Sequence, residues 1–262
     1  MILDSPIVEP SSQAAAGRRL NDLFWHGEPD TSMLVPRTKR LIEQGTTSTQ
    51  EAGFPLQLLY EFGGLPAIEA MLTLLEQGKG RRLWKWIIKL GNREITTPSP
   101  FTMEVDLAGE IAFRELNFAA PPSDCRDEPL SPSNAFVEIA DKFSPFEREP
   151  FALRAELPTF TWPLLVVSGD RDIRAPRATA AEIVTLAPNG VLIEVREHGH
   201  SALDTAQELA LQIMRDLRDY LAASDSSTRP PLPHDPTASP SLMSRIISTR
   251  LALARALPAR LS

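Results

Sequence analysis

Hydrophobic positions in the first third of the chain follow a helical spacing. Between about Ser11 and Gly91, leucine, isoleucine, methionine and phenylalanine recur three and four residues apart, which is the period of amphipathic helices. Glycines and prolines interrupt this pattern at Gly27, Pro36, Gly53, Gly63, Gly64, Pro66, Gly78 and Gly80. The sequence therefore predicts a set of short helices without strands between them.

Two short runs later in the chain have a different pattern, because they are rich in β-branched residues. The first is Leu-Leu-Val-Val at 164–167 and the second is Val-Leu-Ile-Glu-Val at 191–195. Apolar runs of this length between turn residues predict buried strands, and Pro176 is well placed to start a helix that ends near Leu186. A strand, a helix and a second strand form the unit of a parallel sheet, so we predict an α/β fold.

Further helices are predicted around this unit. Segment 101–118 continues the first helical region, 135–143 forms one more helix, and 203–221 forms a long amphipathic one. Segment 224–240 is dense in serine and proline and is predicted to be a linker. The last helix, 241–257, is basic and amphipathic, so it could lie on an anionic membrane or a partner, dock on its own protein, or be a frayed end.

Composition narrows the classes of function. The chain has 262 residues, is 42% hydrophobic and carries a net charge of -7, so it lacks the cationic excess that general nucleic-acid binding requires. Its single cysteine, Cys125, forms no internal disulfide, and its four histidines show no zinc-ligand spacing. We therefore expect no metal or cofactor. With neither a basic signal-peptide start nor an apolar run of about 18 residues, we expect a cytoplasmic protein without a membrane partner.

Ionisable residues follow both predicted strands. Asp170 and Asp172 come after the first strand, and His198 and His200 come after the second. The carboxyl ends of parallel strands meet at one edge of a sheet, so a carboxylate and an imidazole should lie close together there. Asp172 and His200 are 200 − 172 = 28 residues apart, which suits one helix and one strand between neighbouring parallel strands. This is how an acid and a base are presented for proton transfer.

These motifs resemble the last part of an α/β-hydrolase, whose triad runs in the chain order Ser, then Asp or Glu, then His. Gly169–Asp172 is similar to the superfamily's acid turn, and Gly199-His200 is similar to its final histidine motif. The resemblance implies that Asp172 orients the imidazole and that His200 is the catalytic base. Asp170 is the alternative acid, either aspartate could instead cap the following helix, and His198 is expected to be structural.

About residues 1–222 resemble bacterial hydrolases related to proline iminopeptidases. The segments that carry this resemblance are Leu3–Pro6, Tyr60–Gly64, Gly109–Leu116 and Gly199–Leu203. It implies a serine peptidase of the aminopeptidase type, or an esterase-like enzyme, that acts on a peptide or small-molecule substrate.

The resemblance, together with the composition of the last 40 residues, divides the chain into five parts. Residues 1–10 form a core strand and the entry to a helical lid, 11–160 form the lid over the site, and 161–223 form the C-terminal hydrolase core. The linker at 224–240 and the C-terminal helix at 241–262 follow.

The expected nucleophile is missing from this sequence. No Gly-x-Ser-x-Gly motif occurs in the 262 residues, and the first residues resemble the strand that follows the nucleophile helix. The resemblance thus places the serine about 20 residues before Met1. We expect a partial hydrolase core that is inactive as this chain, with a sheet edge that favours self-association.

Three alternatives remain open. Ser201 could be the nucleophile, although only His234 would then follow it as a histidine. The chain could instead be a non-catalytic remnant, or a module that binds ligands or a partner through the helical lid. Within that lid, an acidic run could hold a substrate's ammonium group or could be a solvated helix face. The run consists of Glu104, Asp106, Glu110 and Glu115.

Overall fold

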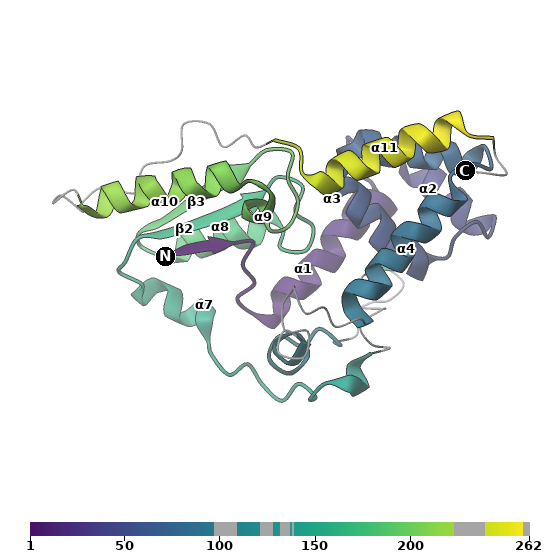
Figure 1. Cartoon of the computed structure of the whole chain (residues 1–262). Coiled ribbons are helices and arrows are strands. Elements are labelled where there is room, and N and C mark those ends of the chain that lie inside the picture. Colours follow the sequence, from purple (N-terminus) through teal and green to yellow (C-terminus); the bar gives the residue numbers. More distant parts are fainter. Residues whose placement is uncertain (97–108, 121–127, 132–136, 138, 223–238, 259–262) are drawn as a thin grey trace.

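The chain forms a small parallel sheet with its own helices and, beside it, an all-helical region (Figure 1). The computed structural model describes residues 1–96, 109–120, 128–131, 137, 139–222 and 239–258. All statements below concern these residues.

The sheet has three parallel strands in the order β1-β2-β3. They are β1 (Ile2–Asp4), β2 (Leu164–Gly169) and β3 (Gly190–Val195). Leu3 pairs with Val166 on β2, and Val167 on β2 pairs with Ile193 on β3. Both strands predicted after residue 160 are confirmed. The helical region is thus an insertion between β1 and β2, which are neighbours in the sheet.

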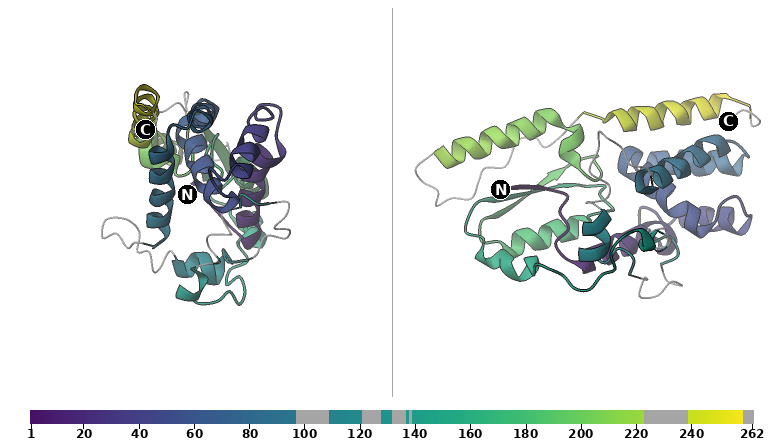
Figure 2. Two further views of the ribbon diagram at one scale, coloured as in Figure 1. Left: turned by 90° about the vertical axis from the view of Figure 1, so that its right-hand side faces the viewer. Right: turned by 60° about the horizontal axis from the view of Figure 1, so that its bottom comes forward.

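Helices cover both faces of this sheet (Figures 1 and 2). Alternate residues of a strand point to opposite faces. Leu165 and Val167 pack with α9 (Ala202–Thr205) and α10 (Gln207–Ala222), whereas Leu164 and Val166 pack with α8 (Arg177–Leu186). All six residues of β2 are buried, as expected of a central strand between two helical layers.

The helical region builds a separate and larger core. It contains α1 (Pro10–Asn21) with the π-helical turn Asp22–His26, then α2 (Val35–Glu43), α3 (Thr49–Glu76) and α4 (Arg81–Thr96). Its largest fully buried side chains include Leu20, Phe24, Leu59, Ile68, Met71 and Ile87. No strand occurs in the described residues 10–96, as the helical spacing predicts.

Ser48 begins α3 with a capping box to Glu51. The predicted break at Gly64 is confirmed, because its non-helical backbone (φ 63°, ψ -167°) divides α3 into two helical stretches. Gly53 does not interrupt it. A Cβ at Gly53 would lie 2.5 Å from the carbonyl oxygen of Leu130, so this glycine permits a close approach of two chain segments.

Among the described residues, α3 is also the one helix that is long and apolar enough to cross a membrane by length and composition. However, 61% of its apolar window is buried inside the protein. A core helix has these properties, because its apolar residues face other helices.

Three other predicted helices have different bounds. Within 101–118, residues 101–108 lie outside the described part, and the rest holds the π-helical turn Ile111–Glu115. Within 135–143, residues 135, 136 and 138 lie outside it, and Ala140–Lys142 is a 3-10 turn. The predicted helix 203–221 is divided at Ala206 into α9 and α10.

The final helix, α11 (Leu242–Ala256), confirms the predicted C-terminal helix. It packs along α3 and α4, so of the three possibilities for this tail the structure shows docking on its own protein (Figures 1 and 2). The predicted linker, 224–240, lies outside the described residues except for 239 and 240. One short helix precedes β2, namely α7 (Leu153–Glu156), followed by the 3-10 turn Leu157–Thr159.

Candidate functional site

Asp172 and His200 lie together at the carboxyl ends of β2 and β3. Asp172 is in the turn that leads from β2 to α8, and His200 is in the turn after β3. His200 Nδ1 lies 3.3 Å from both carboxylate oxygens of Asp172. The Asp172 side chain is fully buried, whereas 27% of the His200 side chain is exposed. The predicted juxtaposition is confirmed, and the roles of acid and base stay predictions.

The backbone around Asp172 fixes the direction of its carboxylate. Ala175 N–H donates to Asp172 Oδ1 at 2.8 Å, within the turn that precedes α8. Helix α8 itself begins after Pro176 without a side-chain cap, so the alternative in which Asp172 caps this helix is wrong. Asp170, the alternative acid, is exposed.

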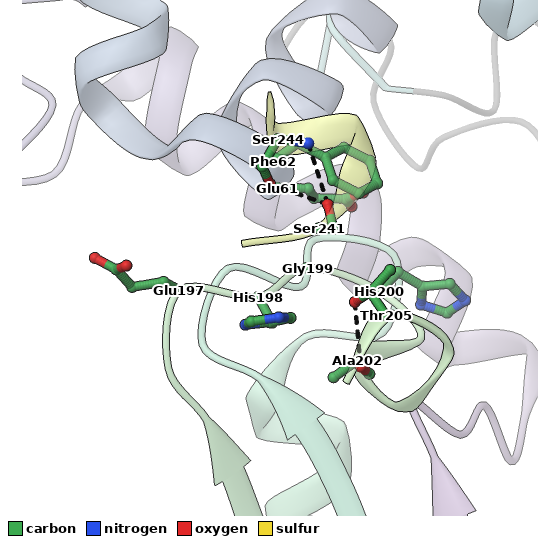
Figure 3. Close-up of a pocket in the computed structure, with 10 residues that line it drawn as sticks. All are labelled: Glu61, Phe62, Glu197, His198, Gly199, His200, Ala202, Thr205, Ser241 and Ser244. Atoms are coloured by element: carbon green, nitrogen blue, oxygen red, sulfur yellow. Dashed lines mark hydrogen bonds between the residues drawn. The ribbon is translucent and has the colours of Figure 1, made fainter. Parts of the chain in front are cut away.

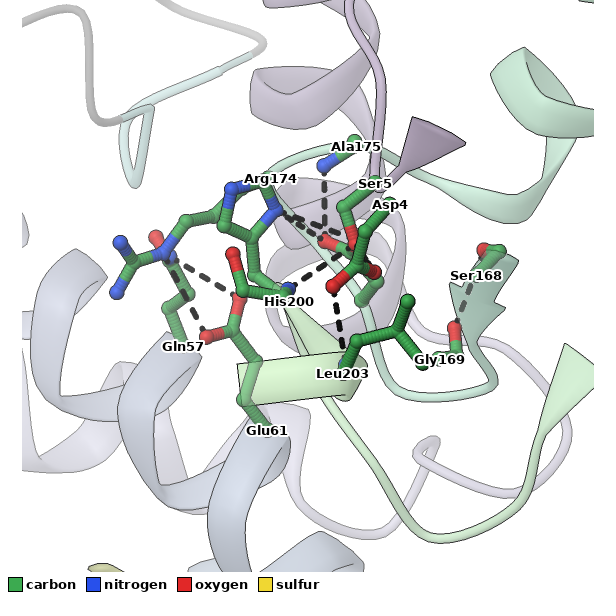
Figure 4. Close-up of polar contacts among 12 residues, drawn as sticks. Asp4, Ser5, Gln57, Glu61, Ser168, Gly169, Arg174, Ala175, His200 and Leu203 are labelled. Atoms are coloured by element: carbon green, nitrogen blue, oxygen red, sulfur yellow. Dashed lines mark hydrogen bonds and ion pairs between the residues drawn. The ribbon is translucent and has the colours of Figure 1, made fainter. Parts of the chain in front are cut away.

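The end of β1 holds the turn that carries His200. Ser5 Oγ accepts a hydrogen bond from the backbone N–H of Ser201 at 3.0 Å, and Asp4 Oδ2 accepts one from Leu203 N–H at 2.9 Å (Figure 4). Burial is the main cause that raises the pKa of Asp4, while the Leu203 N–H opposes it. Ser5 and Ser201 both have positive φ, 51° and 56°, which is uncommon for non-glycine residues. Residues at the carboxyl ends of all three strands thus lie at the turn that carries His200.

His198 projects away from this pair, as expected. Its ring is buried, and Nδ1 lies 2.8 Å from the backbone carbonyl oxygen of Arg196. In Figure 3 the His198 and His200 rings point in different directions. Nε2 of His198 is buried and has no hydrogen-bond partner within the described part of the chain.

Glu61 is a candidate residue that the sequence analysis did not single out. It is only 1% exposed, on the stretch of α3 that faces the turn of His200. Gln57 Nε2 donates to its Oε1 at 3.2 Å, and its Oε2 lies 3.6 Å from Arg174 Nε without a hydrogen bond from any described residue. Burial raises the pKa of Glu61, and Arg174 partly offsets this. The sequence did offer one signal for Glu61, which is the single carboxylate in the mostly apolar segment 56–62.

Glu61, His198 and His200 line a pocket between α3, the turn after β3 and the start of α11 (Figure 3). The pocket is small, with a cavity volume of about 10 Å³, which is room for about one water molecule. Its lining is Glu61, Phe62, Glu197, His198, Gly199, His200, Ala202, Thr205, Ser241 and Ser244. His200 thus lies against the helical region, on the side where a lid was expected.

The acidic run proposed for ammonium binding is not part of this pocket where it is described. Glu104 and Asp106 lie outside the described residues. Glu110 Oε1 accepts a hydrogen bond from the backbone N–H of Ser144 at 3.1 Å, and neither Glu110 nor Glu115 lines the pocket. Among the described residues of segment 11–160, the carboxylate that reaches the pocket is that of Glu61.

The geometry is suited to proton transfer. With Nδ1–H of His200 directed at a buried carboxylate, the other ring nitrogen, Nε2, is the one that can accept a proton. Asp172 would then stabilise the resulting imidazolium. Among the described residues, no group of three or more histidine, cysteine, aspartate or glutamate side chains could hold a metal ion. No protein-family model, curated protein or solved structure matches this chain.

Proposed function

We propose that the chain is of α/β-hydrolase type and serine-hydrolase lineage, aminopeptidase-like or esterase-like, with Asp172 as the acid and His200 as the base. One observation carries this proposal. The Asp172 carboxylate and His200 Nδ1 are 3.3 Å apart at the carboxyl ends of neighbouring parallel strands. That arrangement holds an imidazole in one tautomer and leaves Nε2 available for a nucleophile's proton.

The chemistry would be acyl transfer to a serine hydroxyl. His200 Nε2 would take the hydroxyl proton as the oxygen attacks the carbonyl carbon of a peptide or ester. The same nitrogen would then return the proton to the leaving amine or alcohol. The buried Asp172 carboxylate would stay ionised throughout and stabilise the charged ring. Helix α3, beside the pocket, supports a lid above the substrate.

The pairing can be tested by proton NMR on the full chain. We expect a downfield resonance from the His200 Nδ1–H, because a hydrogen bond to a buried carboxylate deshields this proton. The resonance should disappear in His200→Gln and move upfield in Asp172→Asn. His198→Gln is the matched control, since His198 bonds to a backbone carbonyl instead. If Asp172→Asn left the resonance in place, the acid–base assignment would be wrong.

A second test concerns turnover by the chain itself. Because no Gly-x-Ser-x-Gly motif is present, we expect no triad-dependent hydrolysis by these 262 residues. Wild-type protein and His200→Ala should release product from a p-nitrophenyl ester or a proline anilide at the same background rate. Turnover that His200→Ala abolishes would contradict the proposed inactivity and would require a nucleophile within this chain.

A non-catalytic binding module is the second candidate, and the Glu61–Arg174 contact favours it. This ion pair, at 3.6 Å, joins the helical region to the turn after Asp172, so the charged groups around His200 could serve to fix two regions together. The NMR experiment separates the two candidates. A binding module does not require a directional bond from His200 to Asp172, whereas the hydrolase site does.

A further inference from the structure

The C-terminal helix α11 ends up beside the candidate site although it is the last described element of the chain. A stripe of residues at spacings of four and three, Ile247, Leu251 and Ala254, is buried against the helical region. Ile247 lies over the kinked part of α3, where a Cβ on Gly63 would be 3.8 Å from its Cγ2. α11 therefore packs against the helical region through the side of the helix that carries this stripe.

Polar contacts add to this docking. The Arg250 guanidinium lies over the Trp86 ring of α4, 4.1 Å from its centroid. Lys79 Nζ donates to the backbone carbonyl of Arg255 at 3.2 Å, near the end of the helix, where carbonyl groups lack intrahelical partners. The opposite side of α11 faces solvent, with Leu253 56% exposed.

The docked position places the start of α11 on the pocket. Ser241, the N-cap, is 6% exposed, and it lines the pocket together with Ser244 (Figure 3). Ser241 Oγ accepts the backbone N–H of Ser244 at 3.1 Å, and the two hydroxyl oxygens are 3.0 Å apart. When one hydroxyl donates to the other, the second hydroxyl hydrogen is available to the pocket.

Two buried acceptors share this pocket. Glu61 Oε2 and His198 Nε2 have no hydrogen-bond partner among the described residues, and both residues line the pocket with Ser241. We infer that α11 is a wall of the pocket and that, with Ser241 and Ser244, it encloses a water-sized polar group that donates hydrogen bonds to these two acceptors and accepts one from the serine pair. This inference does not depend on the proposed hydrolase function, because it concerns the walls of the pocket and not the reaction.

The inference can be tested by the reactivity of His198 toward diethyl pyrocarbonate, which modifies accessible unprotonated imidazoles. The full-length variant Ile247→Asp places a charge in the buried stripe and should release α11. We expect the modification rate of His198, relative to the exposed His26, to rise at least about tenfold, since local opening exposes groups that docking protects. Mass spectrometry of the peptides gives the rate at each histidine.

Leu253→Asp is the matched control, because it introduces the same charge on the exposed side of the same helix. It should leave the His198 rate within about twofold of wild type, as a surface substitution does. If Ile247→Asp does not fold, Arg250→Ala removes the contact with Trp86 from outside the core and should raise the His198 rate by a smaller factor. An unchanged His198 rate in a folded Ile247→Asp or in Arg250→Ala would overturn the inference.

Discussion

The Glu61 carboxyl group is buried, so its charged form is poorly solvated in the folded protein. Burial raises its pKa above the ordinary value of 4.5. A raised carboxyl pKa means that the folded state holds the proton more tightly than the unfolded state. Stability therefore falls as the pH rises from about 4.5 through the folded-state pKa, and the loss is complete above it.

We predict that Glu61→Gln stabilises the protein at neutral and higher pH. Glutamine keeps an acceptor for Gln57 and removes the poorly solvated charge. The ion pair with Arg174 is lost too, but burial outweighs it at Glu61 and the Arg174 side chain is 30% exposed, so water can solvate its charge. Since 1 kcal/mol corresponds to about 2–4 °C for a protein of this size, we expect Tm to rise by a few degrees at about pH 8. The difference should vanish at about pH 4, where the wild-type carboxyl is protonated. Scanning calorimetry at several pH values measures this.

Glu76 provides a control with the opposite sign. Its carboxylate accepts hydrogen bonds from Arg37 Nε and Nη2 at 2.9 and 2.7 Å, and this lowers the pKa of Glu76. The stability that it contributes is present above its ordinary value of 4.5 and is lost as the pH falls through the lowered pKa. Glu76→Gln should thus destabilise slightly at neutral pH, by less than about 1 kcal/mol. Equal effects of the two substitutions would refute the burial argument for Glu61.

At the scale of the elements, the local pattern predicted strands better than helices. The strands β2 and β3 were predictable because a short run of β-branched residues between turn residues favours a buried strand over other secondary structure. The break in α3 at Gly64 was predictable from its glycine pair, whereas the continuity of the helix through Gly53 was not, because the role of a glycine there depends on distant neighbours. Gly53 lies against the Leu130 carbonyl, and only the folded chain shows why a small residue is needed there.

The same distinction applies to the candidate site. Asp172 and His200 are separated by one helix and one strand, so sequence spacing was enough to predict that they lie together. Glu61 faces them from an element more than a hundred residues earlier, and Ser5 reaches Ser201 across 196 residues. Such contacts depend on how α3 and β1 dock, which no local periodicity specifies.

At the scale of the whole molecule, the sheet is small and both of its outer strands have a free side within the described part of the chain. β2 is central, while β1 and β3 each pair on one side. In β3, the carbonyl groups of Asn189 and Val195 bind β2, and backbone groups alternate along a strand. The N–H and C=O of Glu194 therefore point to the free side, where unpaired groups can bind a strand from another molecule.

We predict that this edge drives self-association. The average mass from light scattering should rise with protein concentration and exceed the 28.9 kDa of one chain by about twofold or more, because pairing of two edges at least doubles the mass. Glu194→Pro removes the outward N–H without removing a bond to β2, so it should lower the average mass at equal concentration. Glu194→Gln retains the N–H and, like Glu194→Pro, removes the ion pair with Arg177, so the mass should stay high. A monodisperse monomer with a cooperative thermal transition would show instead that three strands and the helical region form a complete core, with no edge available for pairing.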